Sequence, residues 1–112
     1  MTIDFAQLIT AEAKAASELA TRRAAMVCSR LQGRLTLGPQ ICAHIDALAD
    51  PSNGQLDALT GDPAASWAMR ETILNAATWH RTSQTIDELA WVLGLGPEQM
   101  DLMFETAMQI SV

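Results

Sequence analysis

The sequence has two cysteines and two histidines, whose thiol and imidazole groups can bind zinc or act in nucleophilic catalysis: Cys28, Cys42, His44 and His80. Thiolate and imidazole groups are preferred zinc ligands, but they must converge on one point. Cys42 and His44 are two positions apart in a predicted helix, so their side chains point to different faces. Neither cysteine belongs to a CxxC pair. The spacing favours buried thiols and partly exposed imidazoles, and we expect no bound metal and no disulfide.

Covalent catalysis by a cysteine requires a histidine within hydrogen-bonding reach and a set of donors for the oxyanion. Cys28 and His80 are far apart in the sequence, so only the tertiary fold could bring them together. The sequence has no glycine-rich phosphate loop and no serine nucleophile elbow. We therefore expect no catalytic residue and no cofactor, and the protein is predicted not to be an enzyme.

The three tryptophans, Trp67, Trp79 and Trp91, are spaced twelve residues apart. Trp and Arg are enriched at binding hot spots, so Trp79, His80 and Arg81 are a candidate site for binding a partner. The alternative is that the tryptophans belong to the core, since the chain is poor in other aromatic residues.

Composition predicts the architecture that must position these residues. The chain has 112 residues, enough for one domain with its own core. Hydrophobic residues make up 49% and aromatic residues 4%, so alanine and leucine, both strong helix formers, dominate the packing. No run alternates apolar and polar residues over the length of a strand. We predict an all-α, single compact domain (1–112) of about five helices, with a long N-terminal helix and its lead arm in 1–34 and a helical body in 35–112.

Turn and cap residues divide the chain further. Thr10 is a candidate N-cap for a helix of about 22 residues and ~33 Å that ends near residue 32. The further helices are predicted at 39–49, at 55–59 as a single turn, at 63–81, and in a final pair between residues 85 and 107. Proline at a first helical position marks three of these starts: Pro39, Pro63 and Pro97.

The N-terminal helix carries a narrow stripe of small residues: Ala13, Ala16, Ala20 and Ala24. Small side chains allow close approach but bury little area, so this face gains little from covering the rest of the chain. We predict that the helix self-associates, most simply as a two-fold dimer. The residues assigned to this interface are Phe5, Leu8, Ile9, Ala13, Ala16 and Ala20. The alternative is that the helix covers a face made by Trp67 and Leu74 in the same chain.

The net charge is −6, and the charged residues are unevenly distributed along the chain. Residues 1–34 have five basic and three acidic side chains, and residues 35–112 have two arginines against ten acids, which gives +2 and −8. The two parts can attract each other, within one chain or between chains, or both can be ordinary solvated surfaces.

The final pair is the most regular stretch, with Thr85 and Glu88 as a capping box and Gly94 as a turn glycine. With the small Ala90 and the apolar Leu89, Leu93, Leu95, Met100 and Met103, it resembles the helix-turn-helix of DNA-binding proteins. That resemblance would place Gly96, Pro97, Glu98, Asp101 and Leu102 against the major groove. No Lys or Arg follows Arg81. Because phosphate contacts provide most sequence-independent affinity for DNA, we expect no nucleic-acid binding.

The opening IDFAQLITAEAKAASELATRRAA resembles a segment of small tail-associated proteins of bacteriophages and prophages. The resemblance covers about a quarter of the chain and implies a coiled-coil or assembly helix. With no signal-peptide pattern and no apolar stretch of membrane-spanning length, the chain is expected to be cytoplasmic and not membrane-bound. The predicted role is a non-enzymatic protein–protein interaction or assembly protein, phage-related, that forms a homo-oligomer. The alternative is an acidic helix-turn-helix regulator or a partner-binding adaptor.

Overall fold

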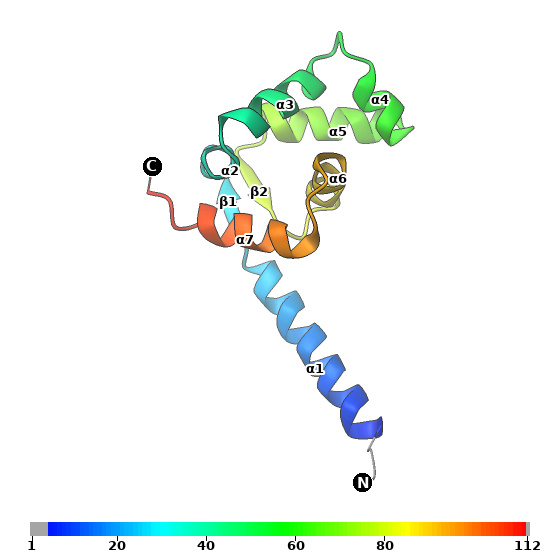
Figure 1. The fold of residues 1–112 in the computed structure, drawn as a ribbon, viewed down its shortest axis with the longest axis vertical. Helices are drawn as coiled ribbons and strands as arrows, with labels where there is room; N and C mark the ends of the chain where they lie inside the picture. Colours follow the sequence, from blue (N-terminus) through cyan, green and yellow to red (C-terminus); the bar gives the residue numbers. More distant parts are fainter. Residues whose placement is uncertain (1–4, 112) are drawn as a thin grey trace.

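A computed structural model describes residues 5–111, except for the side chain of Phe5. Within this range the chain is a mostly helical single domain of seven helices and a small two-stranded sheet (Figure 1). The elements in chain order are α1 (Phe5–Ala24), β1 (Val27–Ser29), α2 (Arg30–Leu37), α3 (Pro39–Ala49), α4 (Gln55–Thr60), α5 (Pro63–Leu74), β2 (Thr78–His80), α6 (Gln84–Leu93) and α7 (Pro97–Ala107).

Except at its C-terminal end, helix α1 stands away from the other helices, and Figure 1 shows it projecting outward. We call α1 the arm and residues 25–111 the body. The predicted helix of residues 10–32 is wrong at both ends, because α1 includes residues 5–9 and ends at Ala24. The amides of Ala25 and Met26 donate to the carbonyls of Arg22 and Arg23 in a tight last turn. Met26 then enters the core, so the chain cannot continue along the helix axis.

The strands β1 and β2 pair antiparallel, with Cys28 opposite Trp79 at the centre. The prediction of no strands is therefore wrong. Three-residue strands are too short to show an alternating pattern, and their pairing joins segments far apart in the sequence. The sheet holds the start of the body against the segment between α5 and α6.

Helix α2 begins directly after β1 with a capping box, in which Ser29 accepts from the amide of Gln32 and the Gln32 side chain accepts from the amide of Ser29. Gly33 of α2 packs against the indole of Trp79: a Cβ at Gly33 would lie 2.4 Å from Trp79 Cε3. The Trp79 Nε1 donates to the carbonyl of Thr72 at 2.9 Å, which fixes the ring. The close approach of α2 to β2 therefore requires glycine at position 33.

The core forms two neighbouring clusters. One joins the sheet to α6 and α7 around Trp79, Ile86 and Phe104. The other joins α3, α4, α5 and α6 around Ile45, Leu56 and Met69. Helix α6 contributes to both, with Ile86 and Ala90 in the first and Leu89 in the second.

Local signals in the sequence predicted several boundaries correctly. Helices α3 and α7 have the predicted limits, α4 is the predicted short turn, and Gly94 ends α6 in the left-handed conformation with φ 72°. The helix predicted over residues 63–81 instead ends at Leu74, because Trp79 is drawn into the sheet. The N-cap of α6 is Ser83, whose hydroxyl accepts from the amide of Ile86, rather than Thr85.

Candidate interaction surfaces and the ion-pair cluster at the base of the arm

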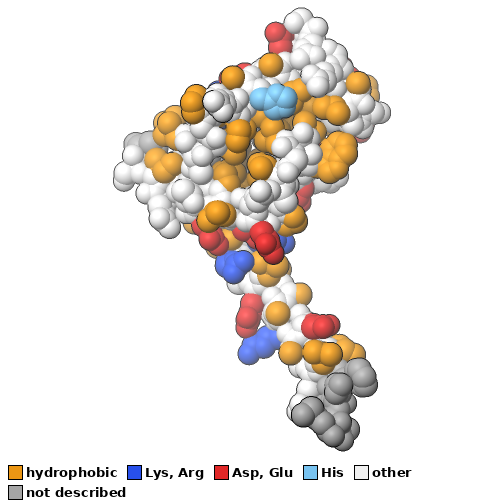
Figure 2. All heavy atoms as spheres, in the orientation of Figure 1, with side chains coloured by type: hydrophobic (Ala, Val, Ile, Leu, Met, Phe, Trp, Pro, Cys, Tyr) orange, Lys and Arg blue, Asp and Glu red, His pale blue; other side chains and the backbone are white. Residues whose placement is uncertain are grey.

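The exposed surface of the arm is the most unusual feature of the structure. Leu8 is 49% and Ile9 64% exposed, and the alanines of the stripe are exposed as well. Figure 2 shows hydrophobic side chains between charged ones along the arm. The arm does not cover Trp67, which is 65% exposed, or Leu74, which is 41% exposed. The alternative in which α1 packs on the face of Trp67 and Leu74 is therefore wrong.

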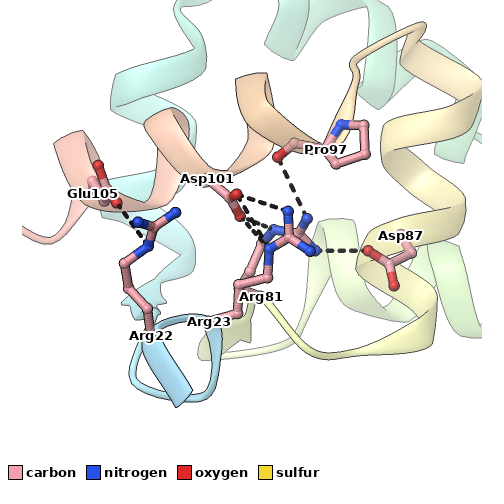
Figure 3. A network of polar contacts seen from close by, with 7 residues as sticks. All are labelled: Arg22, Arg23, Arg81, Asp87, Pro97, Asp101 and Glu105. Carbon is pink, nitrogen blue, oxygen red and sulfur yellow. Dashed lines mark hydrogen bonds and ion pairs between the residues drawn. The ribbon is translucent and has the colours of Figure 1, made fainter. Parts of the chain in front are cut away.

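Two arginines at the end of α1 join the arm to α7 of the body (Figure 3). Arg22 forms an exposed ion pair with Glu105, with Nε 3.8 Å from Oε1. Arg23 makes a bidentate contact with Asp101, through Nε to Oδ1 at 2.9 Å and Nη2 to Oδ2 at 2.8 Å. Two arginines of the basic N-terminal part therefore pair with acidic residues of the body in the same chain.

Asp101 is shared with a second arginine. Arg81 donates from Nε to Asp101 Oδ1 at 2.8 Å and from Nη1 to Asp87 Oδ1 at 2.8 Å. Arg81 and Asp101 are buried, with 6% and 9% of their side chains exposed, whereas the Arg23 side chain is 25% exposed. Two guanidinium groups thus meet two carboxylates, and the cluster has no net charge.

The pKa values of two members of the cluster, Asp101 and Arg23, shift in the directions expected for an ion pair. Hydrogen bonds from Arg23 lower the pKa of Asp101 despite its burial, and Arg81 lowers it further. The same contact with Asp101 raises the pKa of Arg23. Opposite charges stabilise the ionised forms of Asp101 and Arg23, so both remain ionised near neutral pH.

The cluster also changes the interpretation of the helix-turn-helix resemblance. The skeleton is present, since α6 and α7 are joined by a turn at Gly94 and their apolar residues are buried. Asp101, which the resemblance would place against a DNA groove, is instead buried beneath two arginines. The first turn of α7 is thereby tied to the arm and to Arg81, whose Nη2 lies 3.4 Å from the carbonyl oxygen of Pro97.

Trp79, His80 and Arg81, which were predicted to form a recognition patch, do not form an exposed surface together. Trp79 is 1% and Arg81 5% exposed, and only His80 is on the outside. Trp79 is buried because its ring fills the space beside Gly33, and Arg81 because it pairs with Asp101. The assignment of these three residues to partner binding is therefore wrong for Trp79 and Arg81.

Trp91, like Trp67, is exposed and does not belong to the core, contrary to the alternative drawn from the sequence. It is 66% exposed on α6, beside an open groove of about 340 Å³. Residues lining the groove include Leu59, Ala65, Met69, Glu88 and Val92. A signal was present in the sequence, because Trp91 falls outside the helical stripe of Ile86, Leu89, Ala90 and Leu93. Figure 2 shows hydrophobic side chains gathered on one face of the body.

The residues with possible metal or nucleophile chemistry are dispersed. Cys28 and Cys42 are buried free thiols in different parts of the core, and burial raises the pKa of Cys28 to about 11. A thiol with so high a pKa is a poor nucleophile at neutral pH. Among the described residues, no three His, Cys, Asp or Glu side chains come together as a metal site would require.

No described helix combines the length and the apolar character needed to cross a membrane. Comparisons with protein-family models, with curated proteins and with solved structures found no match to this chain.

Proposed function

We propose that this chain is a non-enzymatic assembly protein whose arm is a protein–protein interaction surface and whose body anchors that arm. The observation that carries the proposal is a 20-residue helix that projects from the body with its apolar residues exposed. The ion pairs of Arg22 and Arg23 hold its base to α7, so the body sets the direction in which the arm projects.

The dimensions of the chain support an arm that is covered in an assembly. The radius of gyration is 17.0 Å, whereas a compact domain of this length has about 13 Å. The accessible surface is 7138 Å², against about 6,000 Å² for a compact monomer of this mass. The excess of roughly 1,100 Å² is surface that the extended shape of the single chain exposes.

Substitution of Ala20 by Glu tests the proposal, because it places a charge in the middle of the apolar stripe. Sedimentation equilibrium or light scattering at high micromolar concentration should show an oligomer for the unaltered protein and a monomer for Ala20→Glu. The helical circular dichroism contributed by the body and the melting temperature of the body should remain, since Ala20 is exposed in the single chain and the core lies in the body.

Ala11→Glu is the matched control, since Ala11 is an exposed residue on the opposite face of the same helix. This variant should retain the mass of the unaltered protein. A monomeric unaltered protein, or equal effects of Ala11→Glu and Ala20→Glu, would contradict self-assembly through the stripe.

The exposed Trp91 supports a second candidate function, an adaptor that binds a partner protein through the body. An exposed tryptophan beside an open groove is typical of binding hot spots. Trp91→Ala should then abolish partner capture without loss of stability, because the side chain is 66% exposed. Trp67→Ala serves as the control, since Trp67 is equally exposed but is not among the residues that line this groove. Equal capture by both variants would reject the adaptor function.

The opening segment resembles small phage tail-associated proteins. This resemblance supports the assembly role, and on it we also propose a phage origin for the protein. An arm of this kind suits a protein that assembles with copies of itself or with other structural proteins. A gene located among phage tail genes would support this origin, and a gene outside any phage cluster would count against it.

A further inference from the structure

We infer that the partner of the arm is the arm of a second copy, packed antiparallel, with Ile9 of each chain over Ala20 of the other. This inference rests on the proposed function and specifies its partner and geometry. It predicts a two-fold dimer in which the two bodies lie at opposite ends of a short helical pair.

The first argument is the symmetry of the apolar stripe. Ile9 and Ala20 lie at equal distances on either side of the midpoint between Lys14 and Ala15, and so do Ala13 and Ala16. All four residues are exposed and share one face of α1. A two-fold axis through that midpoint places Ile9 opposite Ala20 and Ala13 opposite Ala16, so the stripe is complementary to itself.

Side-chain size distinguishes this arrangement from a parallel pair. The large residue of the stripe, Ile9, is near the outer end, whereas the half near the body has only alanines. In an antiparallel pair each isoleucine meets an alanine, and the two helix axes remain at one separation along their whole length. A parallel pair sets Ile9 against Ile9 and Ala20 against Ala20, which forces the helices apart at one end and leaves poor packing there.

The charge of the bodies provides the second argument. Residues 25–112 have four arginines against ten acidic residues, so each body is acidic. A parallel pair would bring the two acidic bodies to the same end, where they repel each other. An antiparallel pair of 20-residue helices separates the bodies by about 30 Å, far beyond the screening length of about 8 Å at physiological ionic strength.

Disulfide trapping between introduced cysteines tests the arrangement. Ile9→Cys and Ala20→Cys are made in separate full-length proteins, one of them labelled with ¹⁵N, which are then mixed and oxidised briefly. The native Cys28 and Cys42 are buried and should not react in this time. The mixture should give a linked dimer of intermediate mass, containing one chain of each kind.

Each variant alone should not form linked dimers. In the antiparallel pair, equivalent positions lie about 16 Å apart along the axis, and a disulfide needs Cα atoms within roughly 7 Å. Efficient linking of Ile9→Cys with itself would overturn the inference in favour of a parallel pair. Dimers by light scattering that link in no combination would also overturn it but leave the proposed function intact. Monomers would overturn both.

A double-mutant cycle gives the same answer without cysteines. Ile9→Ala removes the large residue, Ala20→Ile fills the space opposite, and the double variant exchanges the two. Within one chain these positions are about 16 Å apart along the helix, so they cannot interact directly. Recovery of the dimer dissociation constant in the double variant, to within threefold of the unaltered protein, would therefore support antiparallel contact. Additive losses in the two single variants would reject it.

Discussion

Asp101→Asn should destabilise the protein far more than substitution of an exposed carboxylate would. The substitution removes the one carboxylate that pairs with both Arg23 and Arg81. Arg23 is partly exposed and can turn to water, but the Arg81 side chain is only 6% exposed and cannot. The buried guanidinium then retains one carboxylate partner, Asp87, and a weak contact with the carbonyl of Pro97.

The size of the effect follows from the burial of Arg81. Removing one partner of a buried ion pair lowers the free energy of unfolding by about 3–5 kcal/mol. Because Arg81 keeps its contact with Asp87, we expect a loss at the lower end of this range, about 3 kcal/mol. For a domain of this size the loss corresponds to a decrease in melting temperature of roughly 10–15 °C. Urea unfolding followed by circular dichroism would measure it, with the midpoint lowered and the slope unchanged.

Asp46→Asn is the matched control. Asp46 also forms a bidentate pair with an arginine, with two distances of 2.8 Å to Arg34, but its side chain is 45% exposed. Exposed pairs contribute less than about 1 kcal/mol, so this variant should remain close to the unaltered protein. If Asp101→Asn costs no more than Asp46→Asn, burial of the Arg81–Asp101 pair does not stabilise the fold.

The pH dependence gives an independent measurement of the same cluster. In the folded state the pKa of Asp101 is lowered, mainly by its hydrogen bonds from Arg23 and to a smaller extent by Arg81. Its contribution to stability is therefore complete above the unfolded carboxyl pKa of about 3.9 and is lost as the pH falls through the folded value. The difference in stability between the unaltered protein and Asp101→Asn should shrink below about pH 4, and a constant difference would contradict this account.

Three further predictions concern the core and the surface charge. Gly33→Ala should lower the free energy of unfolding by roughly 1–2 kcal/mol in a denaturant titration, since overpacking against Trp79 outweighs the gain in helix propensity. Gly54→Ala is the control: no atom lies within 4 Å of its added Cβ, so it should change stability by less than about 0.5 kcal/mol. Because the pKa of Cys28 is raised to about 11, stability should fall between about pH 9 and 11 as the unfolded thiol ionises. Cys28→Ala should reduce this loss, and the remainder comes from Cys42, whose pKa is also raised by burial. Finally, a mobility-shift assay at low salt should detect no binding of DNA to the acidic α6–α7 pair, and retardation that weakens with added salt would refute that prediction.

The parts of the fold that the sequence predicted are those with local causes. Pro39, Pro63 and Pro97 mark the starts of three helices because proline fits the first helical position, and Gly94 ends α6 because glycine accepts a positive φ. Each of these signals acts within one turn of chain. Ser29 and Gln32 form a capping box of the same local kind, so the start of α2 could also have been read from the sequence.

The parts that were missed depend on contacts between distant segments. Nothing near Ala24 stops a helix, and α1 ends there because Met26 and Cys28 enter the core beside Trp79. The helix predicted through residue 81 is broken for the same reason, since Thr78–His80 pairs with β1. Burial of Asp101 likewise requires arginines that are far from it in the sequence. Helical periodicity alone cannot predict any of these three features.

The contrast between the base of the arm and its remainder is the strongest structural reason to assign function to α1. At the base, Arg23 is committed to a buried carboxylate, which fixes where the helix leaves the body. Beyond it, the ion pair of Lys14 and Glu18 is exposed and spans 4.0 Å, and such pairs add only about 0.2–0.5 kcal/mol. Most of the stability of a protein helix comes from tertiary packing, which this part of the arm lacks in the single chain. A helix with an anchored base and an exposed apolar stripe gains that packing only from another molecule, and the symmetry of the stripe about Lys14 and Ala15 favours a second copy of the same arm.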